Sequence, residues 1–108
     1  MKTNVPTVGE VLEQEFIKPL ELSQNGLAKA LGIPQNRISN IVNGKCGVSA
    51  DTDLRLCKYF GLTEGYFSGM QLDFERIKAK QSIAGELKRI APIHYLLPQE
   101  QTKQRKVG

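Results

Sequence analysis

The sequence predicts an all-α protein built from five or six short helices. Apolar residues recur at helical spacing over most of the chain. Residues that begin helices, such as Ser23 and Ser49, alternate with residues that end them, such as Pro19 and Gly61. No segment alternates apolar and polar residues strongly enough to require a strand, although the short run 93–97 could form one and is left open. The 108 residues fit one small domain with a modest core.

The first predicted helix covers about residues 7–18. Thr7 and Glu10 have the spacing of a capping box, in which each side chain accepts a hydrogen bond from the other residue's backbone amide. One face of this helix is apolar and carries Val8, Leu12 and Phe16. Pro19 is expected to end the helix because its ring does not fit a helix interior.

Two closely spaced helices follow. Ser23 is the expected N-cap of a helix over 24–31, and Gly32 ends that helix because glycine adopts the left-handed conformation at little cost. Pro34 then begins a third helix, which runs to about residue 42 and closes at the turn residues Asn43 and Gly44.

The remaining helices are predicted from Ser49 onward. A fourth helix starts near Ser49 and stops at Gly61, with an apolar side made of Leu54, Leu56, Cys57 and Phe60. A fifth opens at Thr63 and carries one stripe, Phe67, Met70, Phe74 and Ile77. A sixth covers 82–91, and the polar, basic residues 99–108 are expected to be disordered. We therefore expect a domain over residues 1–80 and a helical or partly disordered C-terminal extension over 81–108.

The distribution of charge favours an anionic partner more than the net charge of +4 does. Between residues 22 and 50 there is no carboxylate, whereas Lys29, Arg37 and Lys45 lie there. A carboxylate at a phosphate contact would cost Coulomb energy, so this stretch suits an approach to nucleic acid. Chance in a short window is the alternative explanation.

Several classes of protein are excluded by what the sequence lacks. Cys46 and Cys57 form no Cys-x-x-Cys pair, and with the single His94 they give no zinc spacing, so we expect free thiols, no metal and no cofactor. The start of the chain lacks a signal peptide, and no apolar run approaches the length of a membrane span, which favours the cytoplasm.

An enzyme is not expected either, and no residue is assigned a catalytic role. The single histidine has no nucleophile near it in the sequence, and there is no glycine-rich phosphate loop. Asp51 and Asp53 could form a carboxylate pair, but they fit the first turn of a helix, where negative charge is stabilised.

Residues 24–43 have the pattern of a helix-turn-helix motif. Ala28 is small where the two helices must approach closely, and Gly32 supplies the turn. The inward positions are apolar and comprise Leu27, Leu31, Ile33, Ile38 and Ile41. In such a motif the second helix enters the major groove of DNA.

The outward side of the third helix has the chemistry for reading bases. The candidate base-reading residues are Gln35, Asn36, Arg37, Ser39 and Asn40. Asn and Gln pair with adenine, and Arg pairs with guanine. The candidate phosphate contacts are Ser23 and Gln24 at one helix start, with Asn43 and Lys45 after the third helix. The alternative is an ordinary solvated helix face.

The same residues resemble a known family. The runs Leu22-Ser23-Gln24, Leu31-Gly32-Ile33 and Asn43-Gly44-Lys45 are similar to the XRE/Cro/cI class of lambda-repressor-like, five-helix DNA-binding domains. Within this class, Lys18-Pro19-Leu20 and the run 49–61 resemble the branch of HigA-type antitoxins. The resemblance covers roughly residues 8–77. Cys46, which replaces a residue that is usually basic, and Asp53, which stands where the branch prefers alanine, depart from the pattern.

The resemblance implies a dimeric repressor that binds a palindrome in its own promoter and silences a small RelE-like, mRNA-cleaving toxin. It implies base contacts from Gln35, Asn36, Arg37 and Asn40, and phosphate contacts from Gln24, Asn43 and Lys45. The stripe Phe67, Met70, Phe74 and Ile77 is either the dimer surface or part of the core. Two other functions stay open: an XRE repressor without a toxin, and a protein-interaction module that no longer binds DNA.

Overall fold

The computed structural model describes residues 5–93 and is helical throughout this range, apart from turns and loops. The elements in order are α1 (Val8–Val11), η1 (Leu12–Ile17), α2 (Gln24–Leu31), α3 (Gln35–Val42), α4 (Ala50–Phe60), α5 (Tyr66–Ser82) and α6 (Ala84–Lys88). The predicted all-α class is therefore confirmed. The predicted disorder over 99–108 lies outside the described residues, as does the run 93–97 except for Ile93, which follows α6 without regular structure.

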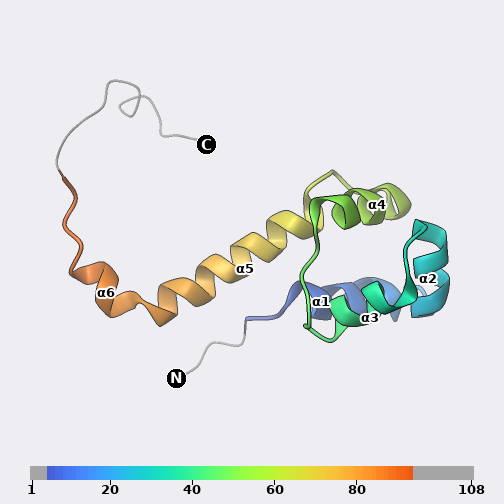
Figure 1. Cartoon of the computed structure of the whole chain (residues 1–108), viewed down its shortest axis with the longest axis horizontal. Coiled ribbons are helices and arrows are strands. Elements are labelled where there is room, and N and C mark those ends of the chain that lie inside the picture. Colours follow the sequence, from blue (N-terminus) through green and yellow to red (C-terminus); the bar gives the residue numbers. More distant parts are fainter. Residues whose placement is uncertain (1–4, 94–108) are drawn as a thin grey trace.

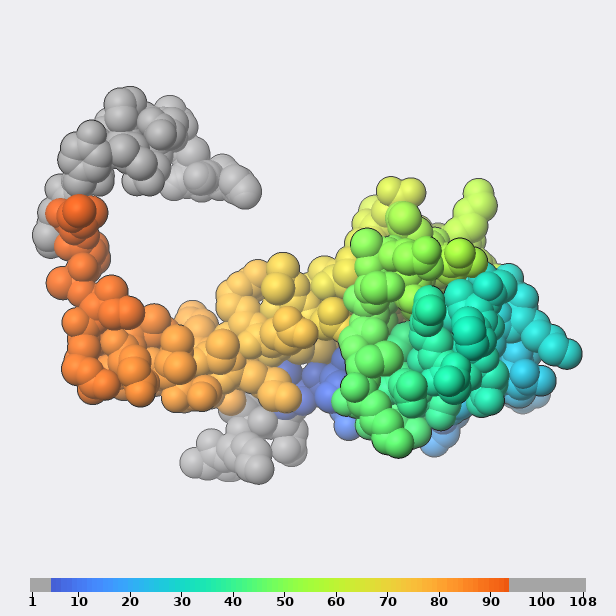
Figure 2. All heavy atoms as spheres, viewed as in Figure 1, coloured from blue at the N-terminus to red at the C-terminus, as the bar shows by residue number. Residues whose placement is uncertain are grey.

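The helices from α1 to α4 form a body from which α5 projects (Figure 1). The first part of α5 packs on this body, and its later part carries α6 away from it. Figure 2 shows α3 and the loop after it at the surface of the body, with the end of α5 and α6 extending beyond it. Within residues 5–93, no helix combines the length and apolar character needed to cross a bilayer.

The N-terminal capping box is confirmed. The Thr7 hydroxyl accepts from the Glu10 amide at 3.0 Å, and the Glu10 carboxylate accepts from the Thr7 amide at 3.1 Å. The helix then widens into η1, a π-helix in which the Lys18 amide donates to the carbonyl of Glu13. It ends at Ile17, and Glu21 adopts a left-handed φ of 55° in the turn that follows. The Leu22 amide donates to the carbonyl of Ile17 and closes this turn.

Most other predicted helix ends are also confirmed. Ser23 accepts from the Gly26 amide at 2.8 Å, and Ser49 accepts from the Thr52 amide at 3.2 Å. Gly32 and Gly61 end α2 and α4 with φ values of 74° and 72°. These interactions join residues a few positions apart, so local chemistry determines them.

Two predicted boundaries were wrong. The fifth helix does not open at Thr63, because Thr63 accepts from the Tyr66 amide within a turn, and α5 begins at Tyr66. The sixth helix is shorter than the predicted 82–91, since α5 continues to Ser82 and α6 ends at Lys88.

One core lies between α1, η1, α2, α3, α4 and the start of α5. Its buried hydrophobic residues are Val8, Leu12, Ile17, Leu27, Ala28, Leu31, Ile38, Ile41, Val48, Leu56, Cys57 and Phe67. Phe16 lies at one end, with its ring centroid 4.8 Å from that of Phe60 and 5.2 Å from that of Phe67. Leu54, which was predicted on the apolar side of the fourth helix, is 47% exposed, and Thr52 and Asp53 are buried on the inner side of α4 instead.

Gly9 allows α1 to lie directly against α3. It is buried, and a Cβ atom built on it would overlap the backbone carbonyl of Ile41. Backbone atoms cannot move aside as a flexible side chain can, so this contact requires glycine. No role was predicted for Gly9, because its constraint comes from the backbone of Ile41, more than thirty residues further along the chain.

Candidate nucleic-acid interface

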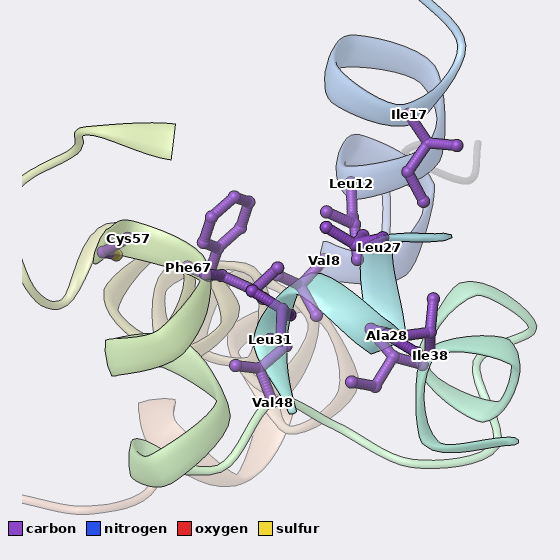
Figure 3. Packing of buried hydrophobic residues seen from close by; sticks show 12 residues of the cluster. Val8, Leu12, Ile17, Leu27, Ala28, Leu31, Ile38, Val48, Cys57 and Phe67 are labelled. Atoms are coloured by element: carbon purple, nitrogen blue, oxygen red, sulfur yellow. The ribbon is translucent and has the colours of Figure 1, made fainter. Parts of the chain in front are cut away.

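The predicted helix-turn-helix is present as α2, a turn at Gly32 and α3. The inward residues Leu27, Ala28, Leu31, Ile38 and Ile41 are buried, and Ile33 is partly buried against the same core. Figure 3 shows Ala28 of α2 beside Ile38 of α3, and Leu27 beside Leu12 of η1. The small side chain of Ala28 allows the close approach that the motif needs.

Burial of Ile38 and Ile41 fixes which side of α3 faces outward. Gln35, Asn36 and Arg37 are exposed in its first turn, whereas Ser39 and Asn40 are partly buried. Pro34 is the N-cap and supplies no side-chain hydrogen bond, so the start of α3 is not covered by its own cap. Three exposed polar side chains near a helix N-terminus match the geometry with which a recognition helix reaches base edges.

The four candidate phosphate contacts differ in exposure and in the hydrogen bonds that they already make within the protein. The Ser23 hydroxyl already caps α2, and Gln24 beside it is partly buried. The Asn43 carboxamide donates to the Ser39 hydroxyl at 3.4 Å, so these two side chains contact each other across the end of α3. Lys45 is exposed, and its backbone amide donates to the carbonyl of Asn40 at 2.8 Å. Lys45 is therefore held close to α3.

Arg55 of α4 holds the end of α2 in place. One guanidinium nitrogen donates to the Leu31 carbonyl at 2.7 Å, and Nε donates to Asp51 at 2.7 Å. The Leu31 carbonyl is among the last carbonyls of α2, which have no partner within the helix. This role of Arg55 was not predicted, since the contact joins residues 24 positions apart.

Asp53 plays the corresponding part at the start of α5. Its side chain is 3% exposed, and its carboxylate accepts from the amides of Gly65, Phe67 and Ser68 at 2.7, 2.9 and 2.9 Å. Helix α5 has no cap of its own, because its N-cap is Gly65. The carboxylate of α4 therefore caps α5 across the interface between the two helices.

The surroundings of Asp53 determine its ionisation. Burial raises its pKa, but hydrogen bonds from the Ser68, Gly65 and Phe67 amides and from the Cys57 thiol outweigh this effect and hold the pKa below its ordinary value of 3.8. The first-turn position predicted for Asp53 is correct, but its main role was missed. No signal in the sequence pointed to this role, because the fifth helix was predicted to open at Thr63 and its glycine N-cap emerges only in the structure.

The stripe predicted on the fifth helix divides between two environments. Phe67 is fully buried in the core, Met70 and Phe74 are partly buried, and Ile77 is 42% exposed. The exposed large aliphatic residues on α5 and in the described residues beyond it comprise Leu72, Ile77, Ile83, Leu87, Ile90 and Ile93. Cys46 is exposed beside Lys45 and Cys57 is buried, and both are free thiols, as expected.

Comparisons with known proteins agree with this geometry. The helix-turn-helix family matches residues 14–67. Virulence-associated protein I of Dichelobacter nodosus is 40% identical over 82 residues, which span 74% of this chain and 76% of that protein. The structure of an addiction module antidote protein of the HigA family from Coxiella burnetii is similar, with a TM-score of 0.76 and 33% identity over 83% of this chain and 99% of that one.

A further similar structure is that of antitoxin GraA in complex with its operator. It superposes with a TM-score of 0.75 and 30% identity, covering 90% of this chain and 96% of that one. The match of family, relatives and fold extends over the α2–α3 pair and the helices that support it. The chain therefore belongs to the XRE-type helix-turn-helix family, in the branch that contains the HigA antitoxins.

Proposed function

We propose that this DNA-binding helix-turn-helix regulator is a sequence-specific repressor that places α3 in the major groove of its operator. The observation that carries the proposal is the exposure of Gln35, Asn36 and Arg37 on α3 while Ile38 and Ile41 are buried. Gln and Asn offer bidentate pairing to adenine, and Arg offers it to guanine. Ser39 and Asn40 complete the proposed base-reading set, with contacts limited by their partial burial.

The electrostatics of this face support the same function. No carboxylate lies between residues 22 and 50, so nothing there repels the phosphates. Lys45, Asn43, Gln24 and Ser23 are the proposed phosphate contacts, which fix the register of the protein on the duplex. The structure of GraA in complex with its operator, a protein of the same fold, supports operator binding as the function.

Selection of bound fragments from random duplex DNA tests the proposal. The wild-type chain is expected to enrich one sequence, and the Gln35→Ala/Arg37→Ala variant is expected to lose that enrichment. Gln81→Ala, a change at an exposed residue late in α5, is the matched control and should enrich the wild-type sequence. Absence of any enriched sequence with the wild-type chain would refute sequence-specific repression and favour an interaction module.

We also propose that the chain is the antitoxin of a type II module and neutralises a small RelE-like, mRNA-cleaving toxin. The support is the similarity to proteins named as a HigA-family antidote and as antitoxin GraA. Co-expression with a small RelE-like protein encoded beside this gene is the test. The toxin alone should arrest growth and cleave mRNA, and the chain should restore growth and form a stable complex with it. Failure to rescue would leave a repressor without a toxin.

A homodimer is proposed because each half of a palindromic operator is bound by one copy of the helix-turn-helix. The α5–α6 surface, defined by Leu72, Ile77, Ile83, Leu87 and Ile90, offers exposed apolar residues for a second copy. The double variant Ile83→Lys/Leu87→Lys should halve the mass measured by light scattering at micromolar concentration. Leu20→Lys, at an equally apolar residue that is 56% exposed but lies outside this surface, should not. A monomeric wild-type chain would contradict the dimer.

A further inference from the structure

The loop between α3 and α4, residues 43–49, carries Lys45 and is held at both ends. Its first half belongs to α3: the Gly44 amide donates to the Ile41 carbonyl, and the Lys45 amide donates to the Asn40 carbonyl. Gly44 has a φ of 76°, so the pair of bonds forms a Schellman-type end to α3. These two hydrogen bonds therefore fix the start of the loop, including the backbone of Lys45, to the end of α3.

The second half of this loop is held by Gln71 of α5. Its side-chain oxygen accepts from the Val48 amide at 2.7 Å, and its side-chain nitrogen donates to the Val48 carbonyl at 3.3 Å. One carboxamide thus satisfies both backbone groups of Val48, as a neighbouring strand would. The Val48 side chain is 3% exposed and anchors the same residue in the core.

Gly47 lies directly beneath this carboxamide. A Cβ atom built on Gly47 would be 2.5 Å from the side-chain oxygen of Gln71, closer than van der Waals contact allows. The absence of a side chain at residue 47 is what lets Gln71 reach the loop backbone. Lys45, with its proposed phosphate contact, lies only two residues before this point.

We propose that Gln71 is a positioning residue for DNA binding: it fixes the 43–49 loop so that the Lys45 ammonium meets a backbone phosphate. Without this anchor the backbone of Val48 loses both of its hydrogen bonds, and the second half of the loop is held only by the buried Val48 side chain and the start of α4. The lysine then loses part of the preorganised position that makes a phosphate contact favourable. The inference rests on the proposed function and extends it, since it connects the phosphate contact to α5, the helix that carries the proposed dimer surface.

The dependence of operator affinity on salt separates positioning from simple stabilisation. Each phosphate neutralised by a lysine adds about 0.9 to the slope of log affinity against log salt, which is about a threefold change between 50 and 200 mM salt. A variant that is merely less stable but still folded keeps the wild-type slope. A variant that loses the Lys45 contact has a slope smaller by about one.

The experiment measures fluorescence anisotropy of the selected operator duplex at several salt concentrations, using the full chain. Lys45→Ala and Gln71→Ala should each reduce the slope by about one, and the double variant should show little further reduction. Gly47→Ala adds a methyl group that displaces the Gln71 carboxamide from the loop, so it should behave like Gln71→Ala. Thermal unfolding establishes that each variant is folded at the temperature of the assay.

One control matches the change without touching the loop. Gln81→Ala removes an exposed carboxamide later in α5 and should keep the wild-type slope. A wild-type slope in both Gln71→Ala and Gly47→Ala, or additive losses in the double variant, would overturn the positioning role while leaving DNA binding intact. A wild-type chain that binds no duplex would instead refute the proposed function itself.

Discussion

Replacing Asp53 with asparagine is expected to lower the free energy of unfolding by about 3 kcal/mol. The carboxylate accepts from three backbone amides at the start of α5. Asparagine keeps one oxygen, which can still accept from Phe67 and Ser68, but its amino group would face the Gly65 amide. Two charge-assisted bonds would become neutral, a loss of about 1 kcal/mol each, and the partly buried Gly65 amide would lose its acceptor, at about 1–3 kcal/mol. Relief of the carboxylate's desolvation offsets part of this sum.

Urea unfolding followed by circular dichroism measures this loss at pH 7. Asp51→Asn is the matched control, because Asp51 lies in the same helix turn and is paired with Arg55 only at the surface. Exposed pairs of this spacing contribute about 0.3–0.5 kcal/mol, so the control should be nearly neutral. Equal stability of the two variants would refute the assignment of Asp53 as the cap of α5.

The pH dependence provides a second measure of the same interaction. Because the pKa of Asp53 is lower in the folded state than its ordinary value of 3.8, ionised Asp53 stabilises the fold above that value. The contribution is lost as pH falls through the folded-state pKa, since the protonated group no longer carries the charge that the amides bind. The difference between wild type and Asp53→Asn should therefore be full at pH 7 and shrink below about pH 4. An undiminished difference at pH 2 would contradict this reasoning.

Four other substitutions test the close contacts, the turn after η1 and the exposed face of α3. Gly9→Ala should destabilise the fold by about 2–3 kcal/mol in thermal unfolding because the added methyl group overlaps the carbonyl of Ile41. Gly69→Ala, with open space around its Cβ, should stabilise it by about 0.5–1 kcal/mol, and equal effects would refute the argument. Glu21→Gly should raise stability by about 1 kcal/mol by relieving the left-handed φ of 55°; a loss would show that the turn is not strained. Arg37→Ala should cost about 1–3 kcal/mol in operator binding and relax the preference at one base pair, whereas an equal loss on all sequences would indicate a phosphate contact.

Most helices could be predicted from the sequence because local interactions determine where they begin and end. Thr7, Ser23 and Ser49 cap helices through hydrogen bonds that span three residues, so a short window contains both partners. The α2–α3 pair was likewise predicted, because the spacing of Ala28, Gly32 and the inward isoleucines is a property of two consecutive helices. The outward position of Gln35, Asn36 and Arg37 followed from that spacing. Resemblance to the XRE-type family added the expected partners, whereas the candidate base and phosphate contacts had already followed from the helix-turn-helix pattern.

Only the tertiary structure decided which polar side chains hold the helices and the loop around α3 in place. Asp53, Arg55 and Gln71 each bind backbone groups 12 to 24 residues away, and no local pattern encodes those partners. The same holds for Leu54, whose apolar side chain fits helical periodicity but lies at the surface because α5 packs on the other side of α4. Neighbouring residues determine short-range hydrogen bonds and helical periodicity. The pairing of side chains with distant backbone groups depends instead on how the helices pack.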